Sequence, residues 1–461
     1  MKIKKISLKN FKCFKEVDID FKKITVLTGG NSSGKSSLLY SILSPLQSEG
    51  FPITYSPNGK YVNMGDFKEI SHNNLKSNKV SLDYVIETDE DDKHEQIEVL
   101  TTWIINPKNQ QPKLYSLECV TQKYNLKIHI KAGEYVFNLQ HLNKEEYLGS
   151  KDFEMNKALA GFLEDIGKII DKEEKEKKGS NRKKKTEISA IDAFLNIDDV
   201  KNLKIKRIED LFLTLRKKNL SSASRSINDV QRRFSEIERH LGFINSFRLF
   251  PERTYYQMTK SDYKVGGYGE NYIDQILRWY ENKSVTYKGL IADLRSLDLL
   301  NGVDIKKLDG GRFELRVQAK PEGPIVSIAD VGFGISQFLP ILVADRQLPK
   351  GSTLLVAQPE IHLHPNVQAK LADYFSRQVK SKEKRYIIET HSEYFLNRLR
   401  LLITKGEIAA EDVAVYYFEN TSTGTTKYSI EFSKDGQIKN APKGFFETYM
   451  MDVMDIALHA E

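Results

Sequence analysis

A glycine-rich segment near the N-terminus has residue types and spacing that favour phosphate binding. Residues 29–36 read Gly-Gly-Asn-Ser-Ser-Gly-Lys-Ser; the apolar run 24–28 precedes them, and apolar residues with helical spacing follow over 38–43. A glycine-rich loop between a strand and a helix surrounds a phosphate with backbone N–H groups and with the positive end of the helix dipole. The pattern favours a phosphate-binding loop over an ordinary turn, with ligands from Gly29, Asn31, Ser32, Ser33, Gly34, Lys35, Ser36 and Ser37.

Two side chains of this loop are expected to contact different parts of a nucleotide. The Lys35 amine would reach the β- and γ-phosphates as a point charge, and the Ser36 hydroxyl would bind Mg²⁺. Gln47, which follows the expected helix, is a second candidate ligand for that magnesium ion, and its alternative is a structural role. ATP and Mg²⁺ are therefore the predicted cofactors.

Two strand-like runs in the last third of the chain end in polar residues that fit the other half of such a site. The run 353–356 precedes Ala357, Gln358 and Glu360, and His391 follows a second run. A phosphate-binding loop needs a second strand that delivers an acid to the metal, together with a group that positions water. Gln358, Glu360 and His391 are therefore the candidates for catalysis, and the alternative for His391 is a structural role.

Taken together, these motifs resemble those of the ABC-class ATPases of the RecF, SMC and OLD group. Residues 8–14 (Leu-Lys-Asn-Phe-Lys-Cys-Phe) are similar to the start of these proteins, and residues 358–365 (Gln-Pro-Glu-Ile-His-Leu-His-Pro) and 389–392 (Glu-Thr-His-Ser) are similar to their Walker B and His-switch segments. Within the group, the chain is particularly similar to stand-alone prokaryotic ATPases of anti-phage operons, such as those of the Septu and PARIS systems. The resemblance is specific over residues 1–45 and 245–450.

The resemblance implies that residues 330–337 form a signature motif, which acts on the nucleotide of a second subunit. Gly332, Gly334, Ser336 and Gln337 would close over the γ-phosphate in trans, helped by the start of a helix. Two ATP molecules would then be buried in a head-to-head dimer, and a homo-oligomer would be built from such ATP-sandwich dimers. An ordinary helix start is the other interpretation of this Gly/Ser-rich turn.

One position departs from the pattern of the group. At the end of the run 353–356 the group has an acid that orients magnesium-bound water, often followed by a catalytic glutamate, whereas this chain has Ala357 and Gln358. A glutamine can position water but cannot accept its proton. Three explanations are open: Glu360 takes over as the acid, hydrolysis is slow, or Ala357 is an engineered replacement that traps bound ATP. The pattern favours the third, and slow hydrolysis would still permit ATP-driven dimerisation.

The resemblance also implies a role in prokaryotic anti-phage defence, with ATP-dependent dimers that hold or release a separate effector. Neither a TOPRIM-like acidic cluster nor an H-N-H pattern is visible in the sequence, so a nuclease of HNH or TOPRIM type is expected as another polypeptide. The alternative is a RecF-like DNA repair ATPase that clamps DNA, because the net charge of +7 permits DNA as a partner without requiring it. A transport ATPase is disfavoured, since such subunits place the signature much nearer the phosphate-binding loop.

The order of strand-like and helix-like patterns predicts an α/β fold, with an ABC-type P-loop ATPase head, an antiparallel β lobe and a helical insertion. No run of the 461 residues approaches 18 apolar positions, and Cys13 and Cys119 lack metal-ligand spacing. A cytoplasmic protein with no membrane partner is therefore expected. Four parts are predicted: residues 1–150 with the phosphate-binding loop and β lobe, the charge-rich helical insertion 151–245, the second half of the head 246–430, and a C-terminal extension 431–461.

Overall fold

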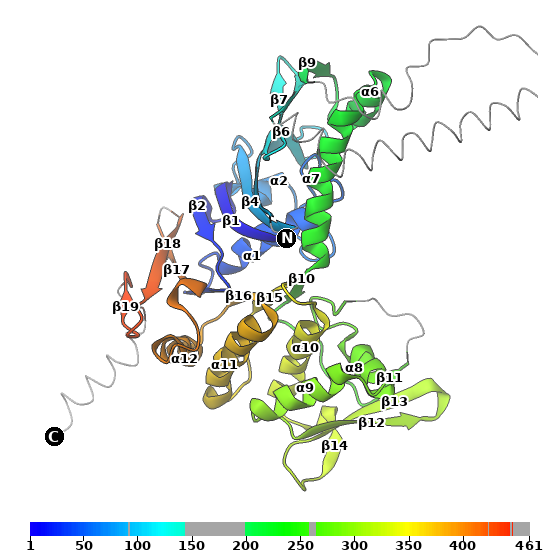
Figure 1. Ribbon diagram of the computed structural model, residues 1–461, viewed down its shortest axis with the longest axis vertical. Coiled ribbons are helices and arrows are strands. Elements are labelled where there is room, and N and C mark those ends of the chain that lie inside the picture. The colour runs from blue at the N-terminus through cyan, green and yellow to red at the C-terminus, as the bar shows by residue number, and fades with distance from the viewer. Residues whose placement is uncertain (91–92, 143–198, 258–263, 423, 443–444, 446–461) are drawn as a thin grey trace, which may run out of the picture.

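A seven-stranded sheet forms the core of the computed structural model, which describes residues 1–90, 93–142, 199–257, 264–422, 424–442 and 445 (Figure 1). The strand order is β10-β15-β16-β3-β17-β18-β19; adjacent strands are parallel from β10 to β17, and the last two continue the sheet antiparallel. Segments from the two ends of the sequence therefore lie side by side, with β3 between β16 and β17. The strands are β3 (Ile24–Gly29), β10 (Leu241–Ile244), β15 (Thr353–Ala357), β16 (Arg385–Glu389), β17 (Val413–Thr421), β18 (Gly424–Phe432) and β19 (Ile438–Lys439).

An eight-stranded antiparallel sheet forms a second layer, with the order β2-β1-β4-β5-β6-β7-β8-β9. Alternate residues of its strands, such as Ile6 and Leu8 or Leu82 and Tyr84, are fully buried, as expected for a sheet with one face on the core. The antiparallel lobe expected from the sequence is this sheet. Its strands are β1 (Lys2–Phe11), β2 (Phe14–Asp20), β4 (Val80–Glu90), β5 (Lys93–Ile105), β6 (Pro112–Val120), β7 (Tyr124–Lys131), β8 (Glu134–His141) and β9 (Val200–Ile205).

Helix α1 (Lys35–Leu46) lies between the two sheets (Figure 1). Its apolar residues Leu38, Leu39, Ile42 and Leu43 belong to one buried cluster that contains side chains from both sheets. Three further helices accompany this layer: α7 (Ser221–Arg239), which contacts α1, and the short α2 (Phe67–Ile70) and α6 (Leu211–Lys217). Because both of its sides are covered, α1 is apolar around most of its circumference.

The opposite face of the central sheet is covered by helices. Val26, Val356 and Ile388 of the central strands share a second buried cluster with side chains of these helices, so the parallel strands are buried on both faces. The helices are α8 (Tyr272–Glu281), α9 (Val285–Ser296), α10 (Phe333–Gln347), α11 (Pro365–Lys382) and α12 (Glu393–Thr404). A small antiparallel sheet stands beside α8 and α9 (Figure 1), with strands β11 (Tyr255–Tyr256), β12 (Gly302–Leu308), β13 (Arg312–Gln318) and β14 (Ile325–Ser327).

The structure confirms the α/β fold. Part of the predicted helical insertion 151–245 belongs instead to the main layers of the molecule. β9 completes the antiparallel sheet, α7 packs against α1, and β10 joins the central sheet, so residues 200–244 belong to the two main layers. The charge-rich stretch 171–187 lies outside the described residues. Among the helices that the structure describes, none has the length and apolar character needed to cross a membrane.

Candidate functional site

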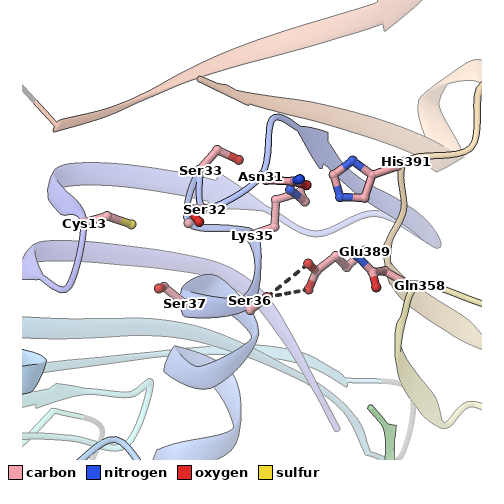
Figure 2. Close-up of a pocket in the computed structure, with 11 residues that line it drawn as sticks. Cys13, Asn31, Ser32, Ser33, Lys35, Ser36, Ser37, Gln358, Glu389 and His391 are labelled. Atoms are coloured by element: carbon pink, nitrogen blue, oxygen red, sulfur yellow. Dashed lines mark hydrogen bonds between the residues drawn. The ribbon is translucent and has the colours of Figure 1, made fainter. Parts of the chain in front are cut away.

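The carboxyl ends of β3, β15 and β16 meet at one edge of the central sheet, because these strands are parallel and adjacent. Open α/β sheets bind their ligands at this edge. A cavity of about 400 Å³ lies there (Figure 2), and a smaller one of about 230 Å³ lies next to it, with Gly29 and His391 in its wall. The larger cavity is lined by Cys13, Asn31, Ser32, Ser33, Gly34, Lys35, Ser36, Ser37, Gln358, Glu389 and His391.

The loop between β3 and α1 has a backbone conformation that requires glycine and several hydrogen-bond donors without partners among the described residues. Gly34 has φ +96°, and a Cβ atom there would lie 2.4 Å from the Cys13 sulfur, so this position requires glycine. The Ser33 hydroxyl is buried and has no hydrogen-bond partner among the described residues. The first N–H groups of α1, which begins at Lys35, lack partners inside the helix. A phosphate oxygen would satisfy both kinds of donor.

Lys35 holds a buried positive charge against this loop. Its Nζ donates hydrogen bonds to the carbonyl oxygens of Gly29 at 3.2 Å and Gly30 at 2.7 Å. The side chain is only 4% exposed, and burial lowers the pKa of Lys35, while the charges of Glu389 and Glu360 act in the opposite direction. A buried ammonium whose hydrogen bonds go to neutral carbonyl oxygens is stabilised further when an anion enters the cavity.

Glu389, the last residue of β16, faces the start of α1 across the cavity (Figure 2). The Ser36 Oγ lies 3.0 Å from both carboxylate oxygens of Glu389 and donates a hydrogen bond to them. Burial raises the pKa of Glu389, and the hydrogen bond from Ser36 and the charge of Lys35 lower it. The sequence-based prediction did not assign this residue, although a carboxylate at the end of an apolar strand was a readable signal.

A strained turn places Gln358 in the cavity wall. Gln358 has a left-handed backbone with φ +47°, and its N–H donates to the Glu389 carbonyl oxygen at 2.7 Å. Arg248 supports the same turn, because its Nη2 donates to the carbonyl oxygens of Ala357 at 2.7 Å and Gln358 at 3.1 Å. Burial lowers the pKa of Arg248 to about 10. We conclude that Arg248 is a positioning residue, since such a backbone persists only when its surroundings hold it.

Glu360 does not line the cavity, in contrast to the catalytic role proposed for it from the sequence. Its Oε1 accepts a hydrogen bond from the backbone N–H of His391 at 2.7 Å, and burial raises the pKa of this carboxyl. The structure therefore gives Glu360 a positioning role beneath the segment that carries His391. Glu360 lies within the turn that follows β15, in which the Ile361 N–H donates to the Gln358 carbonyl oxygen at 3.4 Å.

His391 lies in the cavity wall opposite the phosphate-binding loop (Figure 2). Burial lowers the pKa of the imidazole, and the charge of Lys35 lowers it further. The ring is therefore neutral at pH 7 and can donate one hydrogen bond and accept another. This is a suitable state for contacting a phosphate or its attacking water.

Gln47, the second magnesium candidate, is also absent from the cavity wall. Its Oε1 accepts hydrogen bonds from the N–H groups of Tyr61 and Val62, each at 3.0 Å. Its Nε2 donates to the carbonyl oxygens of Ser56 at 3.2 Å and Val62 at 3.0 Å. Both ends of the amide are occupied by the loop 56–62, so the structure gives Gln47 the structural role.

The signature segment 330–337 lies at the start of α10 and does not line the cavity of its own chain. Ser336 is 2% exposed, and its hydroxyl donates to the Phe333 carbonyl oxygen at 2.9 Å. Gln337 is also buried, with its Nε2 3.5 Å from the Leu249 carbonyl oxygen. These two side chains therefore face inward.

The two glycines of this segment have different surroundings. Gly332 is exposed and precedes the first residue of α10, so the helix start is open to solvent. Gly334 packs against the backbone of His362, and a Cβ atom there would lie 2.4 Å from the His362 carbonyl oxygen. The exposed residues at this end of α10 are thus Gly332 and Phe333.

A phosphate-binding loop at the carboxyl edge of a parallel sheet, opposite a carboxylate and a neutral histidine, places the protein among the P-loop ATPases. Residues 1–396 match the family model described as the AAA ATPase domain, and the chain belongs to that family. Residues 408–456 match a second model, for a protein family of unknown function (DUF3696). No curated protein matches the chain.

The solved structures to which this chain is similar include head domains of SMC proteins. The SMC head domain from Thermotoga maritima is 11% identical, with a TM-score of 0.39, covering 94% of this chain and 100% of that one. The Smc head domain with an extended coiled coil bound to the C-terminal domain of ScpA, from Pyrococcus furiosus, is 13% identical, with a TM-score of 0.39, covering 99% of each chain.

Proposed function

We propose that the protein is an ATP-binding and slowly hydrolysing subunit of a prokaryotic anti-phage defence system, which dimerises around Mg-ATP and scaffolds or controls a separate nuclease. The observation that carries the nucleotide part is the cavity around the phosphate-binding loop. Its buried Ser33 hydroxyl has no partner among the described residues, and the Lys35 amine is held only by carbonyl oxygens in that part of the chain. A triphosphate supplies the anionic oxygens that both groups lack.

Slow hydrolysis is supported by the residues at the end of β15. Ala357 carries no acid, Gln358 cannot accept a proton, and Glu360 is turned toward the backbone of His391. Among the described residues that line the cavity, Glu389 is the sole carboxylate, and it is hydrogen-bonded to Ser36. A positioned general base contributes roughly 10²–10⁴-fold to such a reaction. A site without one binds Mg-ATP and turns it over slowly.

Dimerisation is supported by an exposed aromatic cluster beside the start of α10, formed by Phe250 and Phe333, with Phe247 three residues before Phe250. Phe247 and Phe250 are 80% and 74% exposed, although they are large and apolar. The Phe333 ring contacts the rings of Phe250, with centroids 4.8 Å apart, and His362, at 5.2 Å. Exposed apolar patches of this kind mark interaction surfaces. A second subunit whose nucleotide meets the start of α10 would cover the aromatic cluster.

We expect Phe250→Asp to weaken ATP-dependent dimerisation by at least about tenfold, because it places an unpaired charge where the partner surface excludes water. Binding of ATP to the monomer should not change, since Phe250 does not line the cavity. Sedimentation velocity over a range of protein concentrations, with and without Mg-ATP, measures the effect.

A matched control is Leu213→Asp, which adds the same charge at another exposed apolar residue. Leu213 lies on α6, at the far end of the molecule from α10 (Figure 1). Equal dimerisation by the two variants would contradict the assignment of the aromatic cluster to the dimer interface.

The defence role and the nuclease partner are supported by the resemblance of the motifs to those of ATPases from anti-phage operons. The experiment that tests them is co-expression of the chain with its native operon neighbours, followed by light scattering with and without Mg-ATP. An ATP-dependent dimer or larger assembly that retains a nuclease is the expected result. A chain that assembles alone and binds DNA only with ATP would contradict the proposal and favour a repair clamp.

A further inference from the structure

The ends of β15 and β16 carry very different side chains at neighbouring positions. Ala357 and Glu389 are paired in the register of these parallel strands. Leu355 and Ile387, two residues earlier, belong to the buried cluster on the α1 side of the central sheet. Because side chains alternate between the faces of a strand, Ala357 and Glu389 both project to that side, where α1 begins. The methyl group and the carboxylate thus lie side by side.

We propose that Glu389 is the protein carboxylate that binds the magnesium ion of Mg-ATP together with Ser36, in place of an acid at Ala357. This inference rests on the proposed ATP binding and assigns its metal ligand. Among the residues that the structure describes, Glu389 is the carboxylate that lines the cavity; it is only 5% exposed, and both of its oxygens lie 3.0 Å from the Ser36 hydroxyl.

The donor set fits Mg²⁺ in chemistry and in spacing. Magnesium takes oxygen ligands at about 2.0–2.1 Å in octahedral geometry, so adjacent ligands lie about 2.8–3.0 Å apart. This is the separation of the Ser36 and Glu389 oxygens. An ion can therefore replace their hydrogen bond without moving either oxygen, if the hydroxyl proton turns away.

Two protein ligands are sufficient for this ion. Magnesium usually binds through one or two protein groups, and takes phosphate oxygens and water at its other positions. Glu360 is not a third ligand, because it does not line the cavity. Lys35, which precedes Ser36 in the chain, also lines the cavity and can contact the phosphates as a cation.

Glu389→Gln tests the assignment, because glutamine has the same size and its amide oxygen can still accept from Ser36. Titration of fluorescent ATP in Mg²⁺ and in EDTA gives the ratio of the two affinities. We call this ratio, by which the metal strengthens ATP binding, the magnesium factor. We expect this factor to fall at least about tenfold in the variant, since a neutral amide is a poor magnesium ligand. Affinity in EDTA should be equal or higher, because a charge that repels phosphate is gone.

Three further variants sharpen the result. Glu411→Gln makes the same substitution at an exposed residue of the short helical turn Ala410–Asp412, which lines neither cavity, and should leave the magnesium factor unchanged. Ala357→Glu combined with Glu389→Gln moves the carboxylate to the neighbouring strand and should restore the factor. Glu389→Asp keeps the charge but withdraws it from Ser36, and should lower the factor even if the glutamine variant folds poorly.

The electron paramagnetic resonance spectrum of Mn²⁺-ATP is a second readout. We expect the wild-type protein to broaden it strongly and the Glu389→Gln protein to leave a larger free-manganese signal. A wild-type magnesium factor in both single Glu389 variants would overturn the assignment while the proposed function stands. Absence of ATP binding by the wild-type protein, in Mg²⁺ and in EDTA, would instead refute the proposed function.

Discussion

Lys35→Ala is expected to abolish measurable ATP binding. The Lys35 ammonium is 4% exposed and lies on the phosphate-binding loop, 2.7 Å from the Gly30 carbonyl oxygen. Each hydrogen bond from a charged donor contributes about 1.5–3 kcal/mol, and this amine would serve two phosphates. Its loss should therefore weaken binding by at least about a hundredfold. Isothermal titration calorimetry with Mg-ATP measures the change.

The same substitution should not destabilise the protein without nucleotide. Burial lowers the pKa of Lys35, which means that the folded state holds its charge at a cost. Lys22→Ala, just before the opposite end of β3, removes an exposed lysine and is the matched control. Tight ATP binding by Lys35→Ala, with wild-type behaviour of Lys22→Ala, would disprove the site assignment.

Ala357→Glu is expected to raise ATP turnover at least tenfold. The new carboxylate would project beside Glu389, on the side of the sheet that faces the start of α1. There it can orient magnesium-bound water, which is the role expected of an acid at this position, and accurate positioning of the reacting groups is worth about tenfold or more. Steady-state release of inorganic phosphate measures the rate.

The charge that Ala357→Glu introduces beside Glu389 gives a second expected result. Two adjacent buried carboxylates repel one another, so the variant should unfold at a lower temperature in EDTA and recover in Mg-ATP. Ala357→Gln, which adds similar volume without an acid, should leave turnover unchanged. A wild-type rate in Ala357→Glu would show that position 357 is not where the reaction needs an acid.

The sequence predicted the phosphate-binding half of the site because its signals are local. The glycine spacing, the apolar run before it and the helical pattern after it all lie within residues 24–46, and the structure forms β3, the loop and α1 there. Gln358 and His391 were also predicted, and both line the cavity. Their strands end at the same edge because a parallel sheet aligns its carboxyl ends.

Glu389 and Glu360 show why the rest was not predictable. Glu389 becomes important because β16 lies between β3 and β15, and this order depends on pairing between distant segments. Glu360 is only two residues beyond Gln358, but it lies in the turn that Gln358 begins and accepts the N–H of His391 instead of lining the cavity. β9 lies within residues 151–245, for which the sequence predicts helices. Its strand character depends on pairing with β8, which is distant in the sequence.

The order of the central sheet has a consequence for how the protein is made. Both hydrogen-bonded neighbours of β3 come from the last part of the chain, because β16 begins at Arg385 and β17 ends at Thr421. Roughly 390 residues separate β3 from the end of β17, and a ribosome adds about 5–20 residues each second. The nascent apolar strand therefore waits on the order of 20 to 80 s without partners. A chain that ends before Arg385 has both edges of β3 unpaired and lacks Glu389 and His391, so it cannot form the cavity at the phosphate-binding loop.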